Sequence, residues 1–165
     1  DFSAKFAQEM QEELDIPISS VNTAEDAVKD VDIVITMTTT RKPVLLGDWL
    51  QPGQHINAAG SNHWIRQEVD DNVIKRADRI VVDSIEDAKI EAGDLLFPIE
   101  RGRVMWSGIR DLSDLVAGHI LGRESDKEIT LFESQGIAIS DIAAANFVYK
   151  KAIELGQGTD LPIDS

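Results

Sequence analysis

The chain has 165 residues, 42% of them hydrophobic, which is the size and composition of one domain with a sizeable core. Its 30 acidic residues outnumber 16 basic ones, and the formal charge of −14 disfavours nucleic acid or an anionic membrane surface as a partner, because either would repel the protein. The absence of cysteine excludes disulfides and thiolate metal sites, so redox chemistry would have to come from a bound cofactor.

Targeting and membrane signals are missing from the pattern of the chain. No apolar run is long enough to cross a bilayer, and no segment resembles a signal peptide, so we expect a cytoplasmic protein. The chain begins at Asp1 without an initiator methionine, and its first periodic segment reads as a helix already in progress. We therefore expect a domain that belongs to a longer protein.

The first half of the chain alternates helical and strand patterns. Apolar residues recur at every fourth position over residues 2–14, which predicts an amphipathic helix. Thr23, with an acid three residues later, predicts the start of a second short helix. Residues 32–37 are almost wholly apolar and β-branched, as in a strand buried on both faces. A turn of helix is expected within residues 45–50.

The middle of the chain repeats this alternation. After the turn signal of Pro52 and Gly53, residues 55–59 predict a buried strand, residues 70–77 a short helix, and residues 79–83 another buried strand. Ser84 opens a further helix that is expected to stop at Gly93 and Asp94.

The last third contains the longest predicted helix. Residues 95–108 have no sustained period and indicate a loop or a short strand pair, and a helix capped near Asp111 ends near Gly118. Residues 129–132 predict a final strand, followed by a helix that runs to about Leu155. Short apolar strands alternating with capped helices predict an α/β fold with a doubly wound, mostly parallel sheet and helices on both faces.

Polar loops follow the predicted strands. In a parallel α/β sheet, ligands bind outside the carboxyl ends of the strands, so these loops are expected to share one crevice. Their hydroxyl groups could bond a ribose or an amide, although such residues also occur there simply because they cap helices. The residues concerned are Thr38 and Thr39, then Gly60, Ser61 and Asn62, then Asp83, and finally Ser134 and Gly136.

Several charged residues admit more than one interpretation. Arg66 could hold a substrate carboxylate while Glu68 orients it, or the two could form a surface ion pair. His55 reads as a hydrogen-bonded core residue, and the three histidines lack a metal spacing, so no metal site is expected. The acids Glu86, Asp87, Glu91 and Asp94 are interpreted as a solvated helix face.

Four segments carry a resemblance to a known family. The chain has no G-x-G-x-x-G loop, so a first strand with its phosphate loop would have to lie before Asp1. The four segments are residues 32–36 with 38–39, residues 57–62 with 66 and 68–70, residues 82–84 with 91–94, and residues 128–141, which match best. Through these segments, the chain resembles the ornithine cyclodeaminase and mu-crystallin family of NAD(P)-dependent proteins.

The resemblance implies a Rossmann-like domain that is incomplete at its amino terminus. Residues 1–141 would form part of an NAD(P)-binding domain, and residues 142–165 a closing helix and tail that pack toward a missing dimerisation domain. NAD or NADP is the implied cofactor, and a homodimer the implied assembly. Thr38 and Thr39 match positions that line the cofactor, Ser134 and Gly136 match a turn beside the nicotinamide, and Arg66 matches a basic position after the catalytic loop.

The instructive departure from the family pattern is Asn62. In ornithine cyclodeaminases this position resembles an acid/base aspartate, whereas an amide cannot cycle a proton near neutral pH. We therefore expect an oxidoreductase acting on a small amino or imino acid, with Asn62 and Arg66 as catalytic candidates. The alternatives are a non-catalytic mu-crystallin-like binding protein, ornithine cyclodeaminase itself, and an unrelated doubly wound domain.

Overall fold

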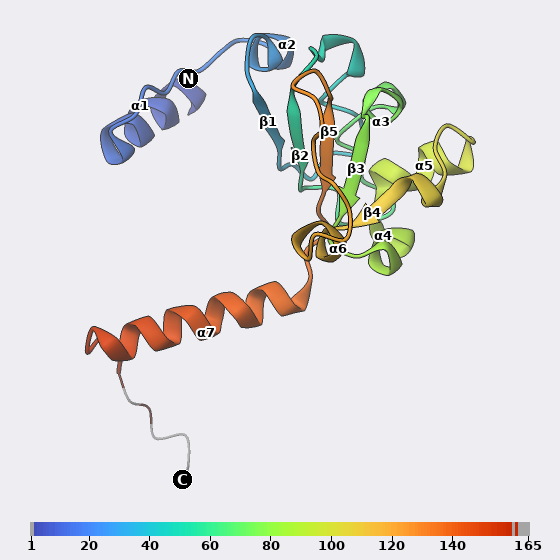
Figure 1. The fold of residues 1–165 in the computed structure, drawn as a ribbon. Helices are drawn as coiled ribbons and strands as arrows, with labels where there is room; N and C mark the ends of the chain where they lie inside the picture. Colours follow the sequence, from blue (N-terminus) through green and yellow to red (C-terminus); the bar gives the residue numbers. More distant parts are fainter. Residues whose placement is uncertain (1, 160, 162–165) are drawn as a thin grey trace. The chain divides into compact units, whose positions relative to one another are not determined.

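A single parallel sheet organises the protein. The computed structural model describes residues 2–159 and 161, and divides the chain into one unit up to Gln135 and a second from Gly136. The first unit contains five strands in the order β1-β2-β5-β3-β4, with β5 inserted between β2 and β3 (Figure 1). Their bounds are β1 (Ile33–Thr36), β2 (His55–Ala58), β3 (Arg79–Val82), β4 (Ile109–Asp111) and β5 (Thr130–Glu133).

Short capped helices connect these strands. The hydroxyl groups of Thr23 and Ser84 and the carboxylate of Asp70 each accept a hydrogen bond from the backbone N–H three residues later, which satisfies a free donor of the first helical turn. The helices are α1 (Phe2–Leu14), α2 (Ala24–Val28), α3 (Asp71–Arg76), α4 (Ile85–Glu91), α5 (Gly93–Glu100) and α6 (Leu112–Val116), with 3₁₀ turns η1 (Gly47–Trp49) and η2 (Trp106–Gly108).

The core lies on one face of the sheet. Because side chains alternate along a strand, Val34 in β1, Ile56 in β2 and Leu131 in β5 are buried while their strand neighbours are half-buried or exposed. Buried residues of α3, α4 and α5 belong to the same core cluster. On the other face, Ile33 and Ile35 remain 58% and 65% exposed, so β1 is not buried on both faces as predicted.

Two predictions for the middle of the chain were wrong. Gly93 and Asp94 do not end a helix, since α4 is capped at Ala92 and α5 begins at Gly93. Residues 95–100, expected to be irregular, are helical, and β4 adds a fifth strand. A Cβ on Gly93 would lie 1.9 Å from the carbonyl oxygen of Arg66, so glycine serves close packing at this position rather than chain reversal.

The second unit begins at Gly136 and contains α7 (Ala138–Glu154). Gly156 and Gly158 adopt positive φ angles of 62° and 110°, and the predicted helix to about Leu155 is confirmed. Among the described residues, no helix is both long and apolar enough to span a bilayer. The expected packing of residues 142–165 toward a further domain stays a prediction, and residues 160 and 162–165 of that tail lie outside the described part.

Candidate functional site

The strand register brings the predicted loops to one edge of the sheet. Thr36 aligns with Ala58, and Ala58 aligns with Glu133, which in turn aligns with Val82. All these pairings are parallel, so the loops after β1, β2, β5 and β3 leave the sheet at the same edge. The predicted convergence of these loops is therefore present within the first unit.

Two of the predicted loops are joined through the carboxylate of Glu68. Its Oε2 accepts hydrogen bonds from Thr36 Oγ1 at 2.9 Å and from the N–H of Gly60 at 2.8 Å, and its Oε1 accepts one from the N–H of Thr38. Glu68 is fully buried, with 0% of its surface exposed. The acid therefore does not pair with Arg66 on the surface, as one interpretation of the sequence proposed.

Asp94 supports Glu68 from the first turn of α5. Its Oδ1 accepts hydrogen bonds from the backbone N–H groups of Glu68 at 2.7 Å and Val69 at 2.9 Å, and its own N–H donates to Ser61 Oγ at 3.2 Å. Burial raises the pKa of Asp94 to about 7, although these hydrogen bonds oppose the shift. The interpretation of Asp94 as part of a solvated helix face was wrong, because the residue is 0% exposed.

Glu133 at the end of β5 completes a buried acid cluster, which we define as Glu68, Asp94 and Glu133. Burial, followed by the negative charges of Asp94 and Glu68, raises the pKa of Glu133 well above its usual range. Within the described part of the chain, Glu133 Oε2, Asp94 Oδ2 and Gln135 Oε1 have no hydrogen-bond partner. The unpaired oxygens of Asp94 and Glu133 favour protonated carboxyl groups. Among the described residues, no cluster of three or more acids or histidines could hold a metal ion.

The two catalytic candidates contact each other at the surface of this edge. Arg66 Nη1 donates to Asn62 Oδ1, and Asn62 is exposed while Arg66 is half-buried. Ser61, predicted to bind cofactor, is instead fully buried, and its hydroxyl group donates to the carbonyl oxygen of Arg66 at 3.0 Å. The loop thus presents an amide and a guanidinium together, while Ser61 fixes the loop from inside.

Among the other predicted cofactor residues, Ser134 and Asp83 form a second pair. Ser134 Oγ donates to Asp83 Oδ2 at 2.7 Å, which joins the loops after β5 and β3. Thr39 is exposed beside Thr38. Gly136 has a φ of 80° and belongs to the second unit.

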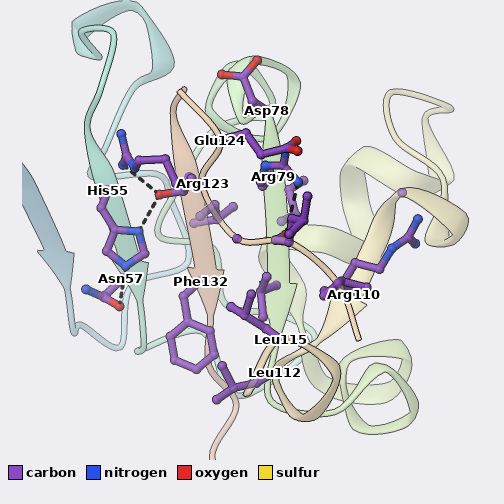
Figure 2. A pocket seen from close by; sticks show the side chains of 18 of the residues that line it. His55, Asn57, Asp78, Arg79, Arg110, Leu112, Leu115, Arg123, Glu124 and Phe132 are labelled. Atoms are coloured by element: carbon purple, nitrogen blue, oxygen red, sulfur yellow. Dashed lines mark hydrogen bonds and ion pairs between the residues drawn. The ribbon is translucent and has the colours of Figure 1, made fainter. Parts of the chain in front are cut away.

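A cavity of the first unit lies elsewhere. About 940 Å³ in volume, it is on the sheet face opposite the core and contains none of the predicted site residues. His55 points toward Thr130 there, with its Nδ1 2.7 Å from Thr130 Oγ1, and Arg123 Nη2 donates to the same oxygen (Figure 2). His55 is hydrogen-bonded as predicted but only half-buried. We place the candidate site at the carboxyl edge because the polar loops meet there.

The sequence interpretation missed the roles of Asp94 and Glu133, although one signal was present. Side chains alternate along a strand, so Glu133 shares the core-facing side of β5 with Leu131. A charged residue in that register indicates a buried acid. No such signal was present in the sequence for Asp94. Gly93 was interpreted as the end of a helix, so Asp94 was not expected to lie in the first turn of α5.

Comparison with known proteins places this fold in a family. The Ornithine cyclodeaminase/mu-crystallin family model matches residues 2–156. A Delta(1)-pyrroline-2-carboxylate reductase of Bacillus cereus is 41% identical over 93% of this chain and 47% of the relative, so the chain spans about half the length of that protein.

Two solved structures share the fold over nearly the whole chain. The Thermococcus litoralis Delta(1)-pyrroline-2-carboxylate reductase, in complex with NADH and L-proline, has a TM-score of 0.89 and 40% identity, covering 95% of this chain and 49% of the other. An archaeal alanine dehydrogenase dimer with bound NAD has a TM-score of 0.83 and 36% identity, covering 96% and 48%. The chain therefore belongs to the ornithine cyclodeaminase/mu-crystallin family, and the Rossmann-like, doubly wound fold is confirmed.

Proposed function

We propose that this protein is an NAD(P)-dependent oxidoreductase that interconverts a small imino acid and the corresponding amino acid. The observation that carries the proposal is the similarity to the Thermococcus litoralis enzyme, whose structure holds NADH and L-proline. The alanine dehydrogenase with bound NAD supports the same class of substrate and cofactor. Both are about twice as long as this chain, so the proposal concerns the protein at the full length its gene encodes.

The carboxyl edge of the sheet suits one end of such a cofactor. Thr38 and Thr39 are exposed at this edge. Position 60 accepts no residue larger than glycine, since a Cβ there would lie 2.2 Å from the carbonyl oxygen of Thr38. We assign Thr38, Gly60, Asn62 and Ser134 to the nicotinamide end of the site. The chain has no glycine-rich phosphate loop, so the grip on the pyrophosphate is not part of this assignment.

The bound nicotinamide would supply or accept the hydride, and the residues of this chain would bind and orient the amino or imino acid. The Arg66 guanidinium can bind a substrate carboxylate with two N–H groups. The Asn62 amide, held by Arg66, can hydrogen-bond the substrate nitrogen or a water. Neither side chain releases a proton near neutral pH, so the proton of the reaction comes from water or from the substrate. This property disfavours cyclodeamination of ornithine.

Substitution at two positions tests the assignment. In the full-length protein, Asn62→Ala and Ser134→Ala should each lower kcat/KM for NADH-dependent reduction of Delta(1)-pyrroline-2-carboxylate by about tenfold or more, the loss typical of a positioned polar contact. The thermal midpoints should change little, because Asn62 is exposed and Ser134 is only half-buried.

The controls are Asn22→Ala and Ser20→Ala, which remove the same groups from exposed positions before β1. Unchanged kinetics in both site variants would remove the site assignment. A panel with NADH, NADPH, cyclic imino acids, and pyruvate with ammonia would identify the substrate and the preferred cofactor.

A non-catalytic binding protein is the second candidate, and the amide at Asn62 favours it. Calorimetric titration with NADH and with each substrate separates the two, since a pure binding protein would show affinity without consuming cofactor. We also propose a cytoplasmic homodimer, and the similarity to an alanine dehydrogenase dimer supports the assembly. The charge of −14 supports the absence of nucleic-acid and membrane partners. Light scattering on the full-length protein tests the assembly.

A further inference from the structure

We propose that Glu68 is a positioning residue, which acts by holding the loops after β1 and β2 in the arrangement that the nicotinamide end of the site requires. The proposal rests on the proposed function and deepens it. Glu68 itself is fully buried, with 0% of its surface exposed. It acts through Thr38 and Gly60, whose backbone N–H groups donate to its two carboxylate oxygens.

The first step of the argument is the number of segments that meet at this one residue. Besides the carboxylate contacts, the carbonyl oxygen of Glu68 accepts hydrogen bonds from the N–H groups of Val44 at 2.8 Å and Leu45 at 3.0 Å. Its own N–H donates to Asp94 Oδ1 at 2.7 Å. The backbone of Glu68 is therefore fixed on both sides, by the segment of Val44 and Leu45 and by Asp94 of α5, so its carboxylate extends from an anchored position.

The second step is the closeness of the two loops. A Cβ on Gly60 would lie 2.2 Å from the carbonyl oxygen and 2.4 Å from the nitrogen of Thr38, both backbone atoms, and 2.5 Å from Glu68 Oε1. The two backbones thus approach as closely as a residue without a side chain permits. Two N–H groups aimed at one carboxylate explain this approach, because each bond to a charged acceptor is stronger than a neutral one.

The third step is that the contact requires a carboxylate rather than any polar group. The three groups that donate to the Glu68 carboxylate are N–H or O–H groups, and together they use both of its oxygens. A glutamine amide would offer only one accepting oxygen. If glutamine placed its NH₂ at the Oε1 position, the Thr38 N–H would lose its acceptor. If it placed the NH₂ at the Oε2 position, the Gly60 N–H would lose its acceptor, so one loop is released in either orientation.

The test combines amide hydrogen exchange with kinetics on full-length wild type and Glu68→Gln. We expect Glu68→Gln to accelerate exchange at the Thr38 or Gly60 N–H by about tenfold or more, the effect of losing a hydrogen bond to a charged group. We expect kcat/KM to fall by about a hundredfold, since small displacements at a reacting centre have effects of that size. Most of the loss should be in kcat, with a smaller rise in KM.

Two matched variants separate positioning from general destabilisation. Thr36→Val removes the third donor to Glu68 but leaves both loop N–H bonds, so its kinetic loss should be much smaller than that of Glu68→Gln. Glu91→Gln removes an exposed carboxylate from α4 and should leave exchange and kinetics unchanged. Should Glu68→Gln fail to fold, Glu68→Asp carries the test, because it keeps the charge but withdraws the carboxylate from both loops.

Three results would overturn the proposal. The first is unchanged exchange at both N–H groups, and the second is faster exchange with kinetics and NADH affinity like those of wild type. The third is an equal loss in Thr36→Val, which would indicate general destabilisation. A wild type that neither binds nor oxidises NADH or NADPH would instead overturn the proposed function, and the positioning role with it, whatever the exchange pattern.

Discussion

Asp94 is buried with one oxygen bonded to two N–H groups and the other oxygen unpaired. Its pKa is raised from 3.8 to about 7, so between these pH values the folded protein holds a proton that the unfolded chain has released. The free energy of unfolding should therefore decrease as pH rises from about 4 to about 7, by about 1.4 kcal/mol per pH unit for this one group. Above pH 7 its contribution becomes constant.

Asp94→Asn tests this residue, because asparagine keeps an oxygen for the two N–H groups and does not titrate. Urea unfolding of the variant should show a shallower decrease of stability over the same pH range, with the slope reduced by about 1.4 kcal/mol per pH unit. Some decrease should remain, because the raised pKa of Glu133 acts in the same direction. Asp126→Asn, an exposed acid, is the control. If the free energy of unfolding had the same pH dependence in wild type and Asp94→Asn, the raised pKa of Asp94 would be contradicted.

At the scale of elements, α5 is held against the loop after β2 by a glycine. A Cβ on Gly93 would lie 1.9 Å from the carbonyl oxygen of Arg66 and 3.0 Å from that of His63, and neither backbone atom can move as a side chain could. Gly93→Ala should therefore decrease the free energy of unfolding by about 1–3 kcal/mol or more, the range for overpacking. Urea midpoints measure the change.

Gly108→Ala provides the matched control, since a Cβ at Gly108 would meet nothing within 4 Å and its φ is not positive. That variant should differ from wild type by less than about 0.5 kcal/mol, as expected for an ordinary surface position. A stability loss of equal size in both variants would show that helix propensity or backbone entropy, rather than the close approach to Arg66, explains the glycine.

The elements that could be predicted from the sequence were those with a strong local pattern. Four strands were placed within about two residues, because each has apolar residues at alternate or successive positions and is bounded by turn signals. β4 has only three residues, too few for a period to be visible. α5 was missed because Gly93 and Pro98 resemble helix breakers, while the packing that accommodates both depends on segments distant in sequence.

The candidate site likewise has a part that could be predicted from local sequence and a part that could not. The loops carrying Thr38, Gly60 and Ser134 could be predicted, because the carboxyl ends of parallel strands share one edge. The burial of Glu68 and Asp94 could not, since it arises from the contact between α5 and the loop after β2. Local sequence therefore predicted which loops share the edge, whereas tertiary packing decides which acids face solvent and which hold the loops.

At the scale of the whole molecule, the charge of −14 is a source of self-repulsion. Six ion pairs of lysine or arginine with an acid occur among residues 2–159 and 161. In three of them both side chains are exposed, so the pairs offset little of this repulsion. Added salt weakens these pairs but also screens the more numerous repulsions among 30 acids. The repulsions outnumber the pairs, so salt should stabilise the protein.

We therefore expect the urea midpoint at pH 7 to rise between about 10 mM and about 200 mM NaCl, over which the Debye length shortens from about 30 Å to below 10 Å. The slope of unfolding free energy against urea should stay constant, because the surface exposed on unfolding does not change. The same titration near pH 4.5, the isoelectric point of the chain, removes the net charge and should abolish the increase. An increase of equal size at both pH values would contradict self-repulsion and would instead indicate the general effect of salt on apolar surface, which does not depend on net charge.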